Sequence, residues 1–152
     1  MIQRKTPKIR IINLGSGSRG NSSIICHGDQ TLMIDCGFSR KQTAQRLLSL
    51  DVDPQSVCGI LITHEHVDHI RGAALFSREA AAPILATQGT LEGGGLATTG
   101  ARPLACGSRI QHQAFQITPI RISHDTREPC AFLVEVDGMR SLFATDIGTA
   151  EG

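Results

Sequence analysis

Histidine is concentrated in one segment of the chain, Thr63-His64-Glu65-His66-Val67-Asp68-His69-Ile70, which directly follows the apolar run 57–62. This segment places three imidazoles and two carboxylates in six consecutive positions. Neutral imidazole nitrogens and carboxylate oxygens are the ligands that zinc and neighbouring transition metals prefer. A buried strand gives such ligands a rigid base. The segment therefore predicts a metal site, in preference to a polar turn that only happens to be rich in histidine.

The spacing within the segment indicates room for two ions. His64 and His66 are two positions apart, so on an extended backbone their side chains point the same way. Glu65 lies between them and faces away, so we expect it to be a supporting residue at most. Asp68 and His69 are adjacent and can turn toward a second point. The zincin motif is excluded, because after His64-Glu65 it needs a histidine at the position that Asp68 occupies.

Four further segments accompany the histidine segment along the chain. They are Leu14-Gly15-Ser16-Gly17-Ser18-Arg19-Gly20-Asn21-Ser22, Leu32-Met33-Ile34-Asp35-Cys36-Gly37, Ser123-His124-Asp125 followed by Glu128-Pro129, and Ala144-Thr145-Asp146-Ile147-Gly148. Together with His64-x-His66-x-Asp68-His69, they resemble the signature of the metallo-β-lactamase-fold hydrolases, and specifically of the YycJ-like (WalJ-like) branch. The resemblance covers nearly the whole chain.

The first half of the sequence alternates strands and helices. Strand patterns cover 9–14, 23–26, 31–35 and 57–62, and a short strand is expected at 84–86. Ser39 and Gln42 fit a capping box that opens a helix. A second helical face runs from 68–69 to 81 and is ended by Pro83. Three consecutive glycines predict that 90–96 is a mobile loop.

The second half of the sequence is predicted to be β. Strands are expected at 114–117, 120–123, 131–136 and 141–145, with a tight Asp137-Gly138 turn between the last two. This order predicts an α+β fold with a mixed β-sheet and flanking helices. The resemblance implies the metallo-β-lactamase-type αβ/βα sandwich, with its metal site at the open edge between two sheets.

The chain ends just past Asp146, where relatives continue into the rest of the second sheet. We therefore expect residues 1–152 to form one metallo-β-lactamase-like domain that is incomplete at its C-terminus, the N-terminal portion only. Such a half sandwich leaves one sheet face uncovered, and self-association through that exposed face is an expected consequence.

The glycines of Gly15-x-Gly17-x-x-Gly20 match the dinucleotide-binding fingerprint in their spacing but not in their structural context. That fingerprint needs a helix to begin at the glycines, so that the helix N-terminus meets the pyrophosphate. The following residues 23–26 have strand character instead, and Gly28 comes soon after. A flexible polar turn at the rim of the site is the preferred interpretation.

The resemblance assigns six metal ligands and one supporting carboxylate. It implies that His64, His66 and His124 bind one divalent ion, while Asp68, His69 and Asp146 bind a second, with Asp146 able to bridge both. It further implies that Asp35 orients a ligating imidazole. Asp68 and Asp35 are thus the carboxylates on which catalysis is expected to depend. Zinc is the expected metal, with Mn or Fe as alternatives, because this ligand set admits all three.

Two of these residues are also plausible from their local sequence. His124 and Asp146 each follow a predicted strand, where a rigid scaffold usually presents a ligand. Taken alone, His124 would be an ordinary surface histidine and Asp146 a carboxylate that caps a turn. His27 and His112 have no potential partner residues beside them in the sequence, and they are predicted to be surface residues. Arg127 is predicted to be a solvated loop arginine.

The reaction expected from two such metals is hydrolysis. Ions about 3.5–4 Å apart lower the pKa of a shared water toward about 7, so a hydroxide that bridges them is available at neutral pH. The resemblance implies that the electrophile is a phosphodiester and that the protein is a nuclease acting on DNA. A hydrolase of small esters, thioesters or lactams is one alternative, and a metal-binding but inactive fragment is another.

Composition neither supports nor excludes a nucleic-acid substrate. The net charge is +1, Trp and Tyr are absent, and Phe occurs five times. Neither the charge nor the aromatic content therefore indicates a polyanionic partner. The five cysteines contain no Cys-x-x-Cys pair and are predicted to be reduced and mostly buried. No signal peptide or membrane span is evident. A cytoplasmic location without membrane attachment is therefore expected.

Overall fold

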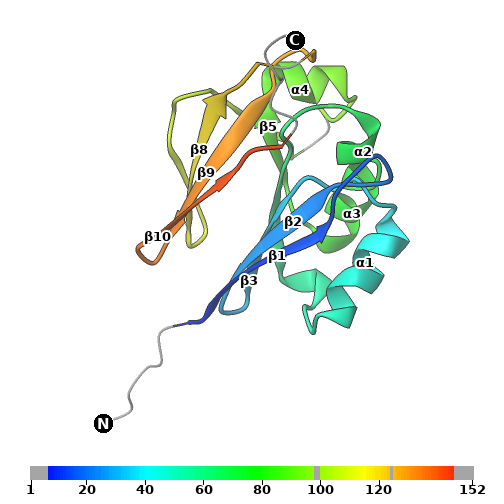
Figure 1. The fold of residues 1–152 in the computed structure, drawn as a ribbon, viewed down its shortest axis with the longest axis vertical. Helices are drawn as coiled ribbons and strands as arrows, with labels where there is room; N and C mark the ends of the chain where they lie inside the picture. The colour runs from blue at the N-terminus through cyan, green and yellow to red at the C-terminus, as the bar shows by residue number, and fades with distance from the viewer. Residues whose placement is uncertain (1–6, 98–99, 124, 146–152) are drawn as a thin grey trace.

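Two β-sheets and one layer of helices make up the part of the chain that the computed structural model describes, residues 7–97, 100–123 and 125–145. The sheets face one another, and the helices cover the outer face of the larger sheet (Figure 1). This arrangement is the α+β architecture with a mixed sheet and flanking helices that the sequence predicts.

The larger sheet has six strands in sequence order, and its parallel half determines where the site lies. Strands β1 to β3 pair antiparallel, and β3 to β6 pair in parallel. Their bounds are β1 Ile9–Gly15, β2 Ser22–His27, β3 Gln30–Ile34, β4 Val57–Leu61, β5 Ile84–Thr87 and β6 Arg102–Leu104. Because β3, β4 and β5 run in parallel, the residues that follow them meet at one edge of the sheet.

The smaller sheet is antiparallel, in the order β10-β9-β8-β7. Its bounds are β7 Ile110–His112, β8 Phe115–Arg121, β9 Cys130–Val136 and β10 Met139–Phe143. Asp137 and Gly138 both have positive φ, 49° and 80°, as the predicted tight turn between β9 and β10 requires.

β8 is one strand where the sequence predicts two. Pro119 lies in its middle and pairs with Phe132 of β9, while β7 covers only residues 115–117 on the other side. The proline therefore removes no ladder hydrogen bond to β7, and its carbonyl accepts one from Gly107 N at 2.8 Å.

The helices follow the predicted signals with two exceptions. Their bounds are α1 Arg40–Ser49, the 3-10 turn η1 Pro54–Ser56, α2 Val67–Ile70, α3 Ala73–Ala80 and α4 Gln88–Gly93. Ser39 and Gln42 form the predicted capping box at α1. The single helix expected over 68–81 is divided at Gly72, where a Cβ would lie 2.2 Å from the Phe38 carbonyl oxygen. This close approach holds α3 against the start of α1.

α4 is the second exception, because the glycine-rich segment 90–96 was predicted to be a loop. Thr87 caps the helix by accepting a hydrogen bond from Thr90 N, and the helix continues to Gly93. The low helix propensity of glycine is overridden by tertiary packing, since Leu91 is buried against the core.

The core consists of two apolar layers, one on each face of the larger sheet. Alternate residues of β2 and β3 show the division: Ile24 and Met33 pack toward the helices, while Ile25 and Leu32 pack toward the smaller sheet. The large side chains of the smaller sheet that meet this second layer are Phe115, Ile117, Phe132 and Val134, all fully buried. Burial on both faces gives the central strands a rigid position from which to present side chains.

The outer face of the smaller sheet is not covered by any helix of the described residues (Figure 1). Ile120 and Leu142 are exposed there or at the sheet edge, to 40% and 61%. Self-association through this face stays a prediction. No helix in the described residues is long and apolar enough to span a membrane.

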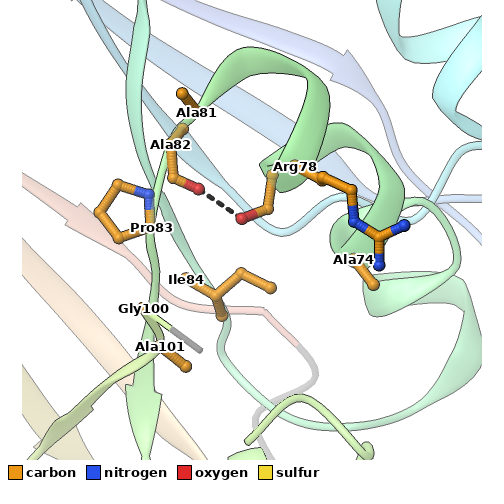
Figure 2. Close-up of a pocket in the computed structure, with 9 residues that line it drawn as sticks. Ala74, Arg78, Ala81, Ala82, Pro83, Ile84, Gly100 and Ala101 are labelled. Atoms are coloured by element: carbon orange, nitrogen blue, oxygen red, sulfur yellow. Dashed lines mark hydrogen bonds between the residues drawn. The ribbon is translucent and has the colours of Figure 1, made fainter. Parts of the chain in front are cut away.

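An open pocket of about 510 Å³ lies beside α3, next to the segment that leads into β5 (Figure 2). Its described lining is mostly small and apolar, with Arg78 as its one charged side chain. Ser77 donates its hydroxyl to the Ala82 carbonyl and is therefore engaged in closing the end of α3. This pocket offers no cluster of groups suited to catalysis.

Candidate metal centre

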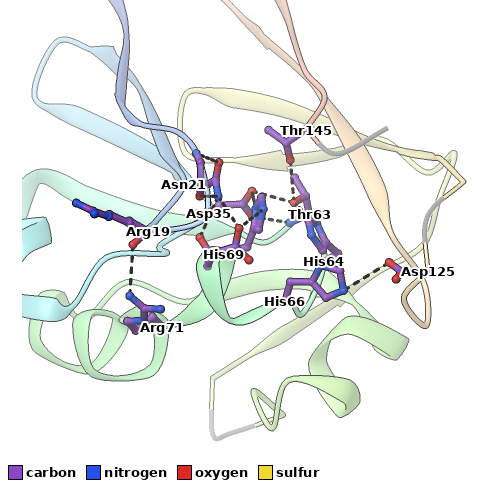
Figure 3. Close-up of polar contacts among 12 residues, drawn as sticks. Arg19, Asn21, Asp35, Thr63, His64, His66, His69, Arg71, Asp125 and Thr145 are labelled. Carbon is purple, nitrogen blue, oxygen red and sulfur yellow. Dashed lines mark hydrogen bonds and ion pairs between the residues drawn. The ribbon is translucent and has the colours of Figure 1, made fainter. Parts of the chain in front are cut away.

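Three histidines of the segment that follows β4 gather in a small volume (Figure 3). The ring centroid of His64 lies 4.8 Å from that of His66 and 4.0 Å from that of His69. His64 and His69 are completely buried, and His66 is partly exposed. Two imidazoles in one buried corner, with a third at its edge, need a shared purpose, since apolar side chains would fill the same buried space at a lower free-energy cost.

Asp35 binds the segment from the end of the neighbouring strand β3. Its Oδ2 accepts a hydrogen bond from Nδ1 of His69 at 2.7 Å and another from the Thr63 hydroxyl at 2.8 Å, while Oδ1 accepts from Thr63 N at 2.8 Å. A neutral His69 that donates through Nδ1 carries its lone pair on Nε2. That nitrogen faces Asp68, whose Oδ2 is 3.6 Å away.

The environment of Asp35 is unusual in two respects. Burial raises the pKa of its carboxyl above the ordinary value, and the hydrogen bonds from His69 and Thr63 oppose that rise. Its φ is +61°, a left-handed conformation that side chains other than glycine rarely adopt. Backbone strain of this kind persists only where surrounding contacts impose it, and it is frequent at functional sites.

Thr63 determines the orientation of a second imidazole. Its single hydroxyl proton is donated to Asp35, so the same oxygen accepts from Nδ1 of His64 at 2.9 Å. His64 then also carries its lone pair on Nε2. The hydroxyl lies 3.3 Å from that of Thr145, just after β10, so the smaller sheet reaches the same point. Sequence reasoning missed Thr63, because a threonine beside a histidine carries no distinctive signal.

Asp68 is positioned by the glycine-serine turn between β1 and β2. Asn21 donates from its backbone to the Asp68 carbonyl at 2.8 Å and from Nδ2 to Asp68 Oδ2 at 3.0 Å. The turn is closed by Nδ2 of Asn21 donating to the Gly17 carbonyl at 2.8 Å. No helix follows it, because β2 begins at Ser22, so the nucleotide-binding interpretation fails as expected. The sequence around Asn21 gives no sign of this role.

A close backbone approach completes this side of the site. A Cβ at Gly37 would lie 1.7 Å from the Asp68 carbonyl oxygen, so only glycine fits there. Gly37 N donates to Asn21 O at 3.0 Å, and Cys36 N donates to His69 O at 2.9 Å. The backbone after β3 thus braces the C-terminal end of the histidine segment.

The loop between β8 and β9 closes the other side. Asp125 Oδ1 lies 3.5 Å from Nε2 of His66, and Cys130 N donates to Thr63 O at 3.0 Å. The predicted ligands His124 and Asp146 lie outside the described residues. Within the described residues alone, no three His, Cys, Asp or Glu side chains stand together as a complete metal site.

The donor set nevertheless fits a divalent metal ion. Two buried imidazoles are fixed through Nδ1 by Asp35 and Thr63, which leaves Nε2 as the nitrogen with the lone pair. A carboxylate held by an asparagine stands beside one of them. Metal-ligating histidines generally donate their other ring nitrogen in this way, which fixes both tautomer and orientation.

Two minor predictions about histidine and cysteine have different outcomes. His112 is buried, not a surface residue, and bonds the Cys58 carbonyl through Nε2 at 2.8 Å and Arg102 through Nδ1 at 3.3 Å. The polar residues around His112 in the sequence favoured an exposed strand, so this contact between the two sheets could not be predicted. All five cysteines are free, three of them buried, as expected. Burial raises the pKa of the Cys36 thiol to about 12, so it is not a reactive group.

Residues 15–95 match the family model of the metallo-beta-lactamase superfamily. The matched range includes the glycine-serine turn, Asp35 and the whole histidine segment. The chain belongs to this superfamily. A solved structure of a mutant metallo-beta-lactamase from Cronobacter sakazakii superimposes on this superfamily member with a TM-score of 0.77 and 18% identity, over 92% of this chain and 61% of the other.

Two curated relatives of this superfamily member are nucleases by name. The exodeoxyribonuclease YycJ of Bacillus anthracis is 28% identical over 140 residues, which are 89% of this chain and 53% of the relative. The ribonuclease TTHA0252 of Thermus thermophilus is 31% identical over 87 residues, 55% of this chain and 20% of the relative. The chain spans about half the length of the exodeoxyribonuclease that it matches.

Proposed function

We propose that this chain carries the metal centre of a metal-dependent phosphodiesterase that acts on DNA. The observation that carries the proposal is the pair of buried imidazoles, His64 and His69, each fixed through Nδ1 by a neighbouring side chain. The choice of DNA is supported by the similarity to an exodeoxyribonuclease over most of this chain. Five free cysteines accord with a reducing cytoplasm, where we place the protein.

The proposed ligand set is the one that the family resemblance implies. His64, His66 and His124 would hold one divalent ion, and Asp68, His69 and Asp146 a second, with zinc as the first choice and Mn or Fe as alternatives. Bound divalent ions supply Lewis acidity and lower the pKa of water toward about 7. The residues of the chain itself provide orientation and burial.

Three supporting residues would perform that orientation. Asp35 keeps His69 in the tautomer with its lone pair on Nε2, and Thr63 does the same for His64. Asn21 holds one oxygen of the Asp68 carboxylate and so limits its rotation. Because His64, His69 and Asp35 are buried, water competes little for these hydrogen bonds, and each is stronger than on the surface.

Two arginines beside the centre are suited to meet a phosphate of the substrate. Arg71 follows α2 directly and donates from Nη1 to the carbonyl of Arg19 at 3.3 Å, which joins the glycine-serine turn to the histidine segment (Figure 3). Both side chains are exposed, and neither forms an ion pair with a described carboxylate. Guanidinium groups bind phosphate oxygens well. These two arginines could therefore bind a phosphate of the substrate locally, although the net charge of the chain is only +1.

The test is hydrolysis by the full-length protein, loaded with zinc or manganese. We expect double-stranded DNA with free ends and a model phosphodiester to be cleaved, and cleavage to be nearly lost in Asp68→Ala. The matched control is Asp29→Ala, which removes an exposed carboxylate from the turn between β2 and β3. Circular dichroism checks that both variants are folded.

Two results would count against the proposal. Hydrolysis of a β-lactam, ester or thioester without any phosphodiester cleavage would assign the site to acyl substrates. Metal binding without turnover of any of these substrates would identify a metal-binding protein that is not an enzyme.

A further inference from the structure

The glycines of α4 form a flat face toward the metal centre. Gly89 and Gly93 are four residues apart and therefore lie on one side of the helix. A Cβ at Gly89 would be 2.7 Å from Cβ of Glu128, and a Cβ at Gly93 would be 2.5 Å from Oε2 of Glu65. The helix has glycine at these positions because two glutamates pack directly against its backbone.

Glu65 connects the histidine segment to the loop that follows β8. It lies between His64 and His66 in the sequence, and its carboxylate packs against α4. Oε1 accepts a hydrogen bond from the backbone N of Arg127 at 3.2 Å. Oε2 is buried against Gly93 and makes no hydrogen bond to a described residue. One oxygen of this carboxylate is thus buried without a hydrogen bond to a described residue, which favours a role beyond solubility.

Glu128 fixes the same loop one residue further on. Its Oε1 accepts from Gly89 N at 2.9 Å. Its carbonyl accepts from the hydroxyls of Thr87 and Thr90, at 2.7 and 3.2 Å. These bonds come from one N-terminal amide of α4 and from the hydroxyls of Thr87 and Thr90, so the end of the loop is attached to the helix and its cap at three points.

The loop that these glutamates hold is the one that contains position 124. It begins after Arg121, where β8 ends, and reaches β9 at Cys130. Asp125 within it lies 3.5 Å from His66. A loop of this length that nothing holds can adopt many conformations. A ligand on such a loop binds a metal more tightly when other contacts already order the loop.

We propose that Glu65 and Glu128 are positioning residues that attach the loop between β8 and β9 to the glycine face of α4 and thereby order this loop, from which the proposed function takes the ligand His124. The proposal rests on the proposed function in one respect, that the centre binds a metal and uses His124. It assigns a purpose to the glutamate between the two histidines and to the glycine-rich segment, neither of which the ligand set explains.

The experiment measures two properties of the full-length protein, zinc affinity by competition with a chromophoric chelator and amide hydrogen exchange of residues 122–130. Glu65→Ala and Glu128→Ala should each weaken zinc binding about 10-fold and speed exchange in this loop. Glu65→Gln should restore both properties, because its amide oxygen can still accept from Arg127 N. A residue acting as a metal ligand or a base would not be rescued by glutamine.

Glu79→Ala is the matched control. Glu79 is exposed and pairs with Arg40 at 3.0 Å, away from the loop, so its loss should change neither property. Gly93→Ala provides an independent variant that leaves both glutamates in place. Alanine favours helix over glycine, so α4 itself should not suffer, yet the new methyl group displaces the Glu65 carboxylate and should weaken zinc binding.

The outcomes separate this proposal from the proposed function. Wild-type protein that binds no zinc contradicts the proposed function, and the positioning role with it, before any variant is made. Wild-type protein that binds zinc tightly while Glu65→Ala and Gly93→Ala keep the same affinity overturns the positioning role alone. Unchanged exchange of residues 122–130 in Glu65→Ala overturns it as well, because the carboxylate then does not hold the loop.

Discussion

Asp35 and His69, 34 positions apart in the sequence, share a 2.7 Å hydrogen bond in which Nδ1 of the imidazole donates to a carboxylate that is 1% exposed. The bond exists because β3 and β4 are parallel neighbours, so the residue after β3 lies beside the segment that follows β4. The same carboxylate accepts both the backbone N–H and the hydroxyl of Thr63. One side chain therefore orients one histidine directly and a second through Thr63.

Asp35→Asn should weaken metal binding by about 10- to 100-fold, the usual cost of altering a group that orients a metal-bound histidine. The amide keeps the shape of the side chain but can turn an N–H toward His69, which moves the lone pair of the imidazole to Nδ1. Zinc affinity of the full-length protein measures the effect, and Asp29→Asn is the exposed control. Wild-type affinity in Asp35→Asn would show that the tautomer of His69 does not matter for metal binding.

Thr63→Val should lower the free energy of unfolding by about 1–3 kcal/mol in the metal-free protein. Valine has the same shape, but it removes the hydroxyl that donates to Asp35 and accepts from His64, so buried polar atoms lose a partner. Urea unfolding measures the change. Thr118→Val is the control, since Thr118 is a partly exposed residue of β8 for which the same substitution should be nearly neutral. Equal effects of the two substitutions would contradict this account of Thr63.

The histidine segment could be recognised from sequence because its signal is local, whereas the residues that support it could not. His64, His66 and Asp68 stand within five positions, and strand alternation relates their directions. Asn21 and Thr63 support them through contacts that depend on the order of strands in the sheet, which no single segment encodes. The structure therefore adds orientation to a set of side chains that the sequence had already grouped.

The fold shows the same division between local and long-range signals. Strands with clear apolar patterns and the capping box at Ser39 were predicted with small errors at their ends. α4 was missed because the three consecutive glycines 93–95 oppose a helix in isolation. In the folded chain Glu65 packs against Gly93, the first of these glycines, and Glu128 packs against Gly89 at the start of the helix. The short strands β6 and β7, of three residues each, carry too little pattern to be recognised.

Thiol labelling should distinguish four of the five cysteines by burial. Burial raises the pKa of Cys36 to about 12 and that of Cys58 to about 11, and it also raises the pKa of Cys106, which lies at a partly exposed site. At pH 8 we expect Cys106 to react first with a disulfide reagent, Cys58 slowly, and Cys36 and Cys130 only after denaturation. Mass spectrometry of the labelled peptides identifies the sites. Rapid labelling of Cys36 in the folded protein would contradict the packing of its thiol against Thr43 of α1.

Arg19→Ala should weaken DNA binding without altering the metal centre. The substitution removes an exposed guanidinium but keeps the Arg19 carbonyl, so the 3.3 Å bond from Arg71 that joins the turn to the histidine segment can persist. Loss of one phosphate contact should reduce the slope of log affinity against log salt by about 1, while zinc affinity stays unchanged. Arg78→Ala, which removes an exposed arginine beside the pocket of Figure 2, is the control. If Arg19→Ala and Arg78→Ala alter the salt dependence equally, the glycine-serine turn does not contact the DNA backbone, and only the general charge of the protein contributes.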